Sequence, residues 1–118
     1  MNVLLSMAKE SSLKGGIMFT RKDMDYVRKV PGYIIYHLNV HDTRIRSMVT
    51  GHDWIIVSSY EWPSCTIEHR HSTRYPFHIQ RGRYKSLKEA MDYIINHDEW
   101  YVENKMKKKM RRAVDQYR

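Results

Sequence analysis

The most regular hydrophobic pattern in the chain spans residues 65–95. Apolar and polar residues mostly alternate over Cys65–His71 and again over Tyr75–Arg81, which is the period of a strand with one buried face. After Arg83 the period changes, and apolar residues recur at helical spacing, at Leu87, Ala90, Met91, Ile94 and Ile95. This pattern predicts a β-hairpin followed by a helix over about residues 86–97, whose apolar face covers the hairpin.

The register of this hairpin follows from the same alternation. If Ile67 shares a buried face with Phe77 and Ile79, a loop of three residues, 72–74, joins the strands, and Ile67 lies opposite Ile79. His69 is then an edge residue opposite Phe77, and Glu68 opposes His78. The polar face of the predicted hairpin holds Thr66, Glu68, Arg70, Pro76, His78 and Gln80.

Three helices are predicted in all. Ser86 and Glu89 form a capping box at the start of the helix over 86–97, where each side chain can satisfy a free backbone amide. Thr20 is a favourable cap for a short helix over about residues 20–30, which Pro31 ends. After a bend at Asp98, a basic amphipathic helix is expected over about residues 99–117. Its apolar side holds Val102, Met106, Met110, Ala113, Val114 and Tyr117.

Three further strands are predicted before the hairpin. Tyr33–Val40 is rich in aromatic and β-branched residues, and Arg44–Val49 is a shorter candidate. Trp54–Tyr60 is apolar on both faces at its start, as in a strand buried on both sides. The connections are too short for crossover helices, so the strands form an antiparallel meander. We therefore expect an α+β fold with a sheet of four or five strands.

The length of 118 residues indicates one domain over residues 1–118. Residues 1–16 contain a Ser- and Gly-rich stretch, which is typical of a loosely ordered arm. The single cysteine, Cys65, excludes an internal disulfide and favours a cytoplasmic protein. No apolar run approaches the length of a membrane span.

The charge of the chain adds a functional indication. It contains 21 Lys and Arg residues but only 13 Asp and Glu residues, for a formal net charge of +8. Residues 101–118 alone carry seven basic and two acidic side chains. Clustered cations of this kind bind nucleic acid by releasing its counterions, or they are merely solvated. The candidate nucleic-acid-binding residues on this helix are Lys105, Lys107, Lys108, Lys109, Arg111 and Arg112.

The hairpin offers a second candidate surface for nucleic acid. A two-stranded ribbon can enter the major groove of DNA, where Arg and Gln side chains match base edges. Glu68 would repel phosphate unless it is paired, so a polar ladder between the strands is the alternative. The candidate residues are Arg70, Arg74, His78, Gln80, Arg81 and Arg83.

No motif predicts an enzyme, a cofactor or a metal site. Cys65, His69 and His71 fall on one side of a strand, but no Cys-x-x-Cys or His-x-x-x-His spacing accompanies them. No glycine-rich phosphate loop, nucleophile elbow or paired-carboxylate signature is present. Trp54, Tyr60 and Trp62 share a strand face where bases can stack, although aromatic residues at strand spacing are usually core.

The sequence Gly-Arg-Tyr-Lys-Ser-Leu-Lys-Glu-Ala at 82–90, after a predicted three-stranded sheet, resembles two families of DNA-binding domains. These are the amino-terminal arm-binding domains of phage integrases and the plant ethylene-response domains, and the resemblance covers about residues 53–97. It implies a sheet face lying in the major groove with the helix packed behind it. It also implies that the following side chains face DNA: Arg70, Arg74, His78, Gln80 and Arg81.

Two functions follow from these patterns. The first is a small non-enzymatic protein that binds DNA or RNA through the basic hairpin face and the basic C-terminal helix. The alternative is a small inhibitor or accessory factor, encoded by a phage or mobile element, that binds a host enzyme through Tyr, Trp and Arg side chains.

Overall fold

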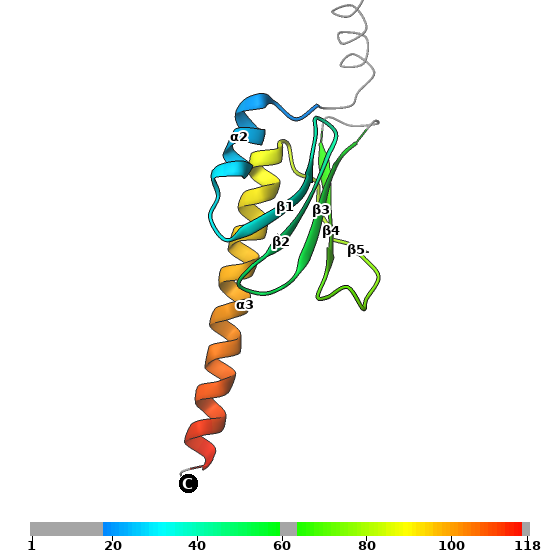
Figure 1. The fold of residues 1–118 in the computed structure, drawn as a ribbon. Helices are drawn as coiled ribbons and strands as arrows, with labels where there is room; N and C mark the ends of the chain where they lie inside the picture. Colours follow the sequence, from blue (N-terminus) through cyan, green and yellow to red (C-terminus); the bar gives the residue numbers. More distant parts are fainter. Residues whose placement is uncertain (1–17, 60–63, 117–118) are drawn as a thin grey trace, which may run out of the picture.

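The computed structural model describes residues 18–59 and 64–116, and these form a five-stranded antiparallel sheet with two helices (Figure 1). The strands are β1 (Tyr33–Leu38), β2 (Asp42–Ser47), β3 (Asp53–Ser58), β4 (Cys65–Arg70) and β5 (His78–Ile79), and they lie in the sheet in chain order. The helices are α2 (Arg21–Lys29) and α3 (Leu87–Gln116). The predicted α+β meander is therefore confirmed. The predicted arm over 1–16 lies outside the described residues, as do Tyr60, Trp62 and Tyr117.

Tight turns join the first three strands. In the β1–β2 turn, the side-chain oxygen of Asn39 accepts hydrogen bonds from the backbone amides of His41 (2.8 Å) and Asp42 (2.9 Å). In the β2–β3 turn, Gly51 has a φ of 77°, a conformation that other residues rarely adopt. Local turn chemistry thus fixes the order of these strands.

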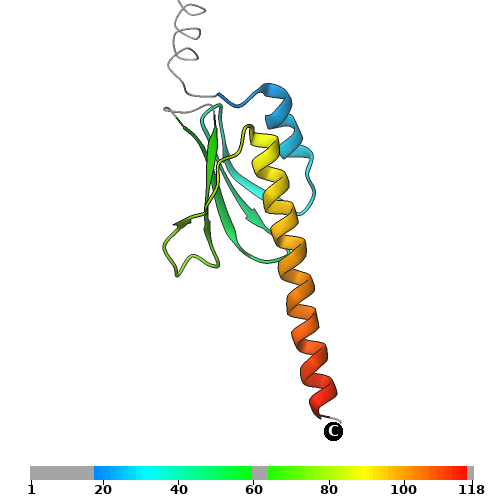
Figure 2. The ribbon, with the colours of Figure 1, turned by 180° about the vertical axis from the view of Figure 1, so that it is seen from behind.

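Both helices pack on the same face of the sheet, as the two opposite views show (Figures 1 and 2). Alternate side chains of β2, β3 and β4 point towards α3. The apolar residues of α3 recur at helical spacing, so they form a stripe that packs against these side chains. Burying each large apolar side chain stabilises the fold by about 1.5–3 kcal/mol. The buried core consists of Phe19, Val27, Ile45, Trp54, Ile56, Cys65, Ile67, Leu87, Ala90, Met91 and Ile94.

The predicted helix caps are present. The Thr20 hydroxyl accepts a hydrogen bond from the Asp23 amide at 3.1 Å. The Ser86 hydroxyl accepts one from the Glu89 amide at 3.1 Å, and the Glu89 carboxylate accepts one from the Lys85 amide at 3.0 Å. The first two bonds satisfy amides that the first helical turn leaves without a partner, and the third satisfies the amide of Lys85, just before the Ser86 cap.

The predicted bend at Asp98 is wrong, because α3 continues without a break through 30 residues. Asp98 is buried, and its carboxylate accepts a hydrogen bond from the Tyr33 hydroxyl on β1 at 2.6 Å. Since that contact ties the side chain to the sheet, Asp98 does not turn back to bond its own backbone and end the helix. The helices predicted over 86–97 and 99–117 are therefore one helix.

The predicted hairpin register is also wrong by one residue. Glu68 pairs with Ile79 and His69 pairs with His78, so Ile79 lies on the outer face, 73% exposed. Beyond β5, Tyr84 forms an isolated bridge with Cys65 through two backbone hydrogen bonds of 2.7 and 2.9 Å. This bridge, together with the irregular segment between Tyr84 and β5, sets the register of β5 against β4. The alternation of apolar residues does not decide it.

Candidate functional site

Part of α3 extends past the sheet, and we call residues 103–116 the projecting segment (Figures 1 and 2). Apart from Asn104, which is partly buried, every residue in it is exposed. Within the described residues, its one ion pair joins Lys107 to Glu103 at 3.3 Å between exposed groups. With six basic and two acidic side chains, the segment is strongly positive. All six helix candidates lie here: Lys105, Lys107, Lys108, Lys109, Arg111 and Arg112.

The projecting segment also carries the predicted apolar side. Met106, Met110 and Val114 are 59%, 66% and 53% exposed, and Met106 also lines a groove with Val49 of the β2–β3 turn. They recur at intervals of four residues, which places them along one side of the helix. The segment is thus amphipathic with its apolar side open.

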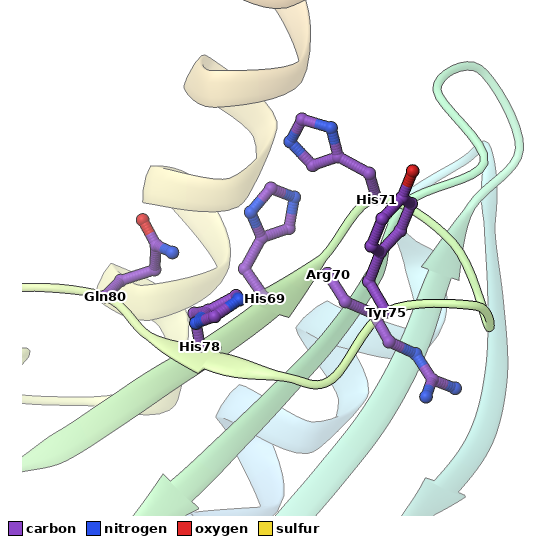
Figure 3. A pocket seen from close by; sticks show the side chains of 6 residues that line it. All are labelled: His69, Arg70, His71, Tyr75, His78 and Gln80. Atoms are coloured by element: carbon purple, nitrogen blue, oxygen red, sulfur yellow. The ribbon is translucent and has the colours of Figure 1, made fainter.

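The hairpin candidates do not form one continuous face. Arg74, Arg81 and Arg83 are exposed on the chain around β5, and Gln80 is partly buried. His78 pairs with His69, whereas Arg70 lies on the opposite side of β4 (Figure 3). Because β5 has only two residues, the β4–β5 hairpin does not form a long two-stranded ribbon that could enter a groove.

Arg70 is held in an ion-pair row across the outer face of the sheet. The Asp53 carboxylate accepts hydrogen bonds from Nε of Arg46 on β2 (2.7 Å) and from Nε of Arg70 on β4 (2.8 Å). Burial alone would raise the pKa of Asp53, but the two guanidinium groups outweigh it and hold the pKa below its usual value. Arg70 also lies over the ring of Phe77 at 4.2 Å. This arginine is therefore occupied by protein contacts.

A cluster that the sequence reasoning missed lies between the sheet and α3. We call it the histidine cluster: His52, His69, His71, His97 and Asp98. Of the ring pairs, Trp54 and His69 stack at 3.8 Å between centroids, and His52 and His71 stack at 4.3 Å. The expected edge position of His69 is wrong, because its ring is buried against Trp54. The prediction that Trp54 belongs to the core is confirmed.

Burial keeps the innermost rings neutral. It lowers the pKa of His52 to about 4, with the neighbouring His71 acting in the same direction. It lowers the pKa of His69 to about 3, with His52 and His97 adding to the effect. Near pH 7 both rings therefore carry a free nitrogen lone pair.

Cys65 is not part of this cluster. It lies at the other end of β4, four residues from His69, which is about 13 Å along a strand. Its thiol donates to the carbonyl oxygens of Tyr84 (3.4 Å) and Ser86 (3.3 Å), and burial raises its pKa to about 12. The described residues that can hold a metal are the histidines and Asp98 instead.

Comparisons of this chain with family models, curated proteins and solved structures found no match. The resemblance to integrase and ethylene-response domains therefore stays a prediction. Within residues 18–59 and 64–116, no helix is long and apolar enough to cross a membrane.

Proposed function

We propose that this protein binds nucleic acid and that the projecting segment supplies most of the contacts. The observation that carries the proposal is a run of six cations between Lys105 and Arg112, on a helix that extends free of the sheet. Cations that neutralise phosphates release condensed counterions, which is the main source of sequence-independent affinity. Binding of this kind needs no catalytic group.

The placement of these cations supports the proposal. At 3.6 residues per turn, they cover about 200° of the helix surface over a length of about 10 Å. Lys108 lies at the centre of that arc and Arg112 about 40° from it, away from the apolar side, whereas Lys109 lies at one edge. Around β5, the exposed Arg74 and Arg81 add positive charge of the kind that positions a polyanion without reading its sequence.

The test is binding of the full chain to fluorescent duplex and single-stranded DNA and RNA over a range of salt concentrations. If all six cations contact phosphates of a duplex, the plot of log affinity against log salt has a slope of about −5. The variant Lys108→Glu/Lys109→Glu/Arg112→Glu should lose at least about a hundredfold in affinity near 0.1 M salt. Affinity that is insensitive to salt or to this variant contradicts the proposal.

A matched control lies on α2. Arg21, Lys22 and Lys29 are exposed, and changing all three to Glu alters the net charge by the same amount. This control should keep nearly all of the affinity, because a local contact surface depends on where charge lies. If both triple variants lose affinity equally, net charge alone is responsible and the projecting segment is not the binding surface.

A protein partner is a second candidate function, and the open apolar side of the projecting segment favours it. Met106, Met110 and Val114 form a stripe of the kind that a partner's groove receives as anchors at helical spacing. In a pull-down from nuclease-treated lysate, a partner retained at high salt and lost in Met106→Glu/Met110→Glu supports this function. Recovery of nucleic acid alone supports the first.

A further inference from the structure

We propose that His52, His69 and His71 bind one divalent transition-metal ion, in a site that opens onto a pocket beside β5. The three residues come from separate places in the sheet: the turn before β3, the buried side of β4, and the position just after β4. One ligand atom from each lies within 4.8 Å of the other two. The pairing of β3 with β4 creates this arrangement, because Trp54 opposes His69 and so brings the flanking histidines together.

The distances suit an ion of the size of zinc. In a tetrahedral site with metal–nitrogen bonds of about 2.0–2.1 Å, ligand nitrogens are about 3.3 Å apart. His52 Nδ1 and His69 Nε2 are already 2.9 Å apart. The ring nitrogen of His71 lies within 4.8 Å of the other two ligand atoms. Because His71 is exposed, its side chain can rotate to bring this nitrogen to bonding distance from the ion. The backbone need not move.

The facing nitrogens of His52 and His69 are placed to bind a metal. Imidazole binds a metal through an unprotonated nitrogen, and the hydrogen bond between His52 Nδ1 and His69 Nε2 requires one of these nitrogens to be unprotonated. Without metal, one of the two facing nitrogens donates its hydrogen to the other. When the ion enters, that ring moves its proton to its other nitrogen, so no net proton is released from the pair.

Two buried polar atoms next to the three ligands lack hydrogen bonds. Asp98 is only 6% exposed, and within the described residues neither its Oδ1 nor Nδ1 of His97 has a hydrogen-bond partner, although the two atoms lie 3.6 Å apart. Leaving a buried donor or acceptor without a hydrogen bond costs about 1–3 kcal/mol. His52, His97 and Asp98 also have ligand atoms within 4.8 Å of one another. We assign Asp98 the role of a neighbouring carboxylate that orients His52 and balances the charge of the ion.

The site is open on one side. A pocket of about 340 Å³ adjoins it, lined by His69, Arg70, His71, Tyr75, His78 and Gln80 (Figure 3). Figure 3 shows the rings of His69 and His71 on the same side of β4, with His78 of β5 and the following Gln80 on the neighbouring segment. Structural zinc sites use four protein ligands, whereas three protein ligands and an open position leave room for water or a small anionic ligand.

The ligand set selects the class of metal. Imidazole suits Zn²⁺, Cu²⁺, Ni²⁺ and Co²⁺, whereas Mg²⁺ and Ca²⁺ prefer oxygen ligands. Zn²⁺ accepts a tetrahedral three-histidine site without a geometric penalty from d electrons. We therefore expect Zn²⁺ and Co²⁺ to bind and Mg²⁺ not to compete.

The test is titration of the full chain, stripped with chelator, with Co²⁺ followed by visible absorption, and then displacement by Zn²⁺. The expected result is about one equivalent of Co²⁺ with the intense spectrum of a tetrahedral ion, which is lost on addition of Zn²⁺. His71→Ala, at an exposed position where folding can be checked by circular dichroism, should weaken binding at least about a hundredfold. Weak, octahedral or non-stoichiometric binding overturns the proposal, as does a folded His71→Ala with unchanged affinity.

Two controls separate the ligands from their neighbours. His78→Ala removes a histidine from the same pocket that belongs to neither group of ligand atoms, so affinity should be unchanged. Asp98→Asn should weaken binding by about tenfold, as expected for a residue that acts through a ligand. If Asp98→Asn abolishes binding while His71→Ala does not, the ion lies among His52, His97 and Asp98, and the assignment is wrong.

Discussion

Replacing Asp53 with Asn tests whether the outer face of the sheet depends on one buried carboxylate. The Asp53 side chain is 3% exposed, and its guanidinium partners on Arg46 and Arg70 are 34% and 21% exposed. A hydrogen bond to a charged group contributes about 1.5–3 kcal/mol. Asn keeps one acceptor oxygen, and water can reach both arginines in part, so the loss falls below the 3–5 kcal/mol of a fully buried pair. We expect Asp53→Asn to lower the free energy of unfolding by about 2 kcal/mol.

Thermal and urea denaturation followed by circular dichroism measure this loss. For a domain of this size, about 2 kcal/mol corresponds to a decrease in Tm of about 8 °C. In a double-mutant cycle, Asp53→Asn and Arg70→Met should show a coupling energy of about 1 kcal/mol, because the residues interact directly. A loss below about 0.5 kcal/mol, or additive effects in the cycle, would refute the reasoning that this row holds β2, β3 and β4 together.

Three further outcomes are expected. Asp92→Asn should destabilise the protein at neutral pH, by an amount that shrinks as the pH is lowered below about 4 in urea titrations. Hydrogen bonds from Lys88 and Tyr26 hold the pKa of Asp92 low, so its contribution is lost as pH falls through the folded-state pKa, and a difference that is constant with pH contradicts this. The Cys65 thiol, buried with its pKa raised to about 12, should resist a thiol reagent near pH 8 until guanidinium unfolds the chain; fast labelling of the folded protein would show that it is accessible. Gly82→Ala should cost about 1–2 kcal/mol by thermal denaturation, because Gly82 has a φ of 111°, and an unchanged Tm would contradict a strained turn.

Local signals account for the parts of the fold that the sequence predicts correctly. The Thr20 cap and the capping box at Ser86 depend on residues three positions apart, and both are present. The alternation over Cys65–His71 places β4, because each apolar side chain on it faces the core. These elements need no information from distant parts of the chain.

The errors arise where distant residues decide. In the sequence, Asp98 looks like a residue that ends a helix. In the structure, the hydroxyl of Tyr33, 65 residues away, donates a hydrogen bond to its carboxylate, and the helix continues. The hairpin register follows the bridge between Cys65 and Tyr84, and an exposed Ile79 results. In each case a tertiary contact outweighs a local preference.

The histidine cluster has no local motif that would reveal it. His52 and His69 are 17 residues apart, and His97 belongs to the helix. A usable signal was the pairing of β3 with β4: once Trp54 is set opposite His69, His52 falls opposite His71. The sequence pattern yields this pairing only if the connection between β3 and β4 is placed correctly.

The unbroken course of α3 sets a fixed spacing between the histidine cluster and the projecting segment. From Asp98, in the histidine cluster, to Arg112, in the projecting segment, the helix rises by about 21 Å at 1.5 Å per residue. No proline or glycine interrupts this part of α3, so the helix stays unkinked and keeps the distance constant. A strand of nucleic acid stacked along the segment would cover the same distance in about six nucleotides. If the proposed binding is correct, a strand bound at Arg112 and extended along α3 would therefore bring a nucleotide about six positions away to the histidine cluster.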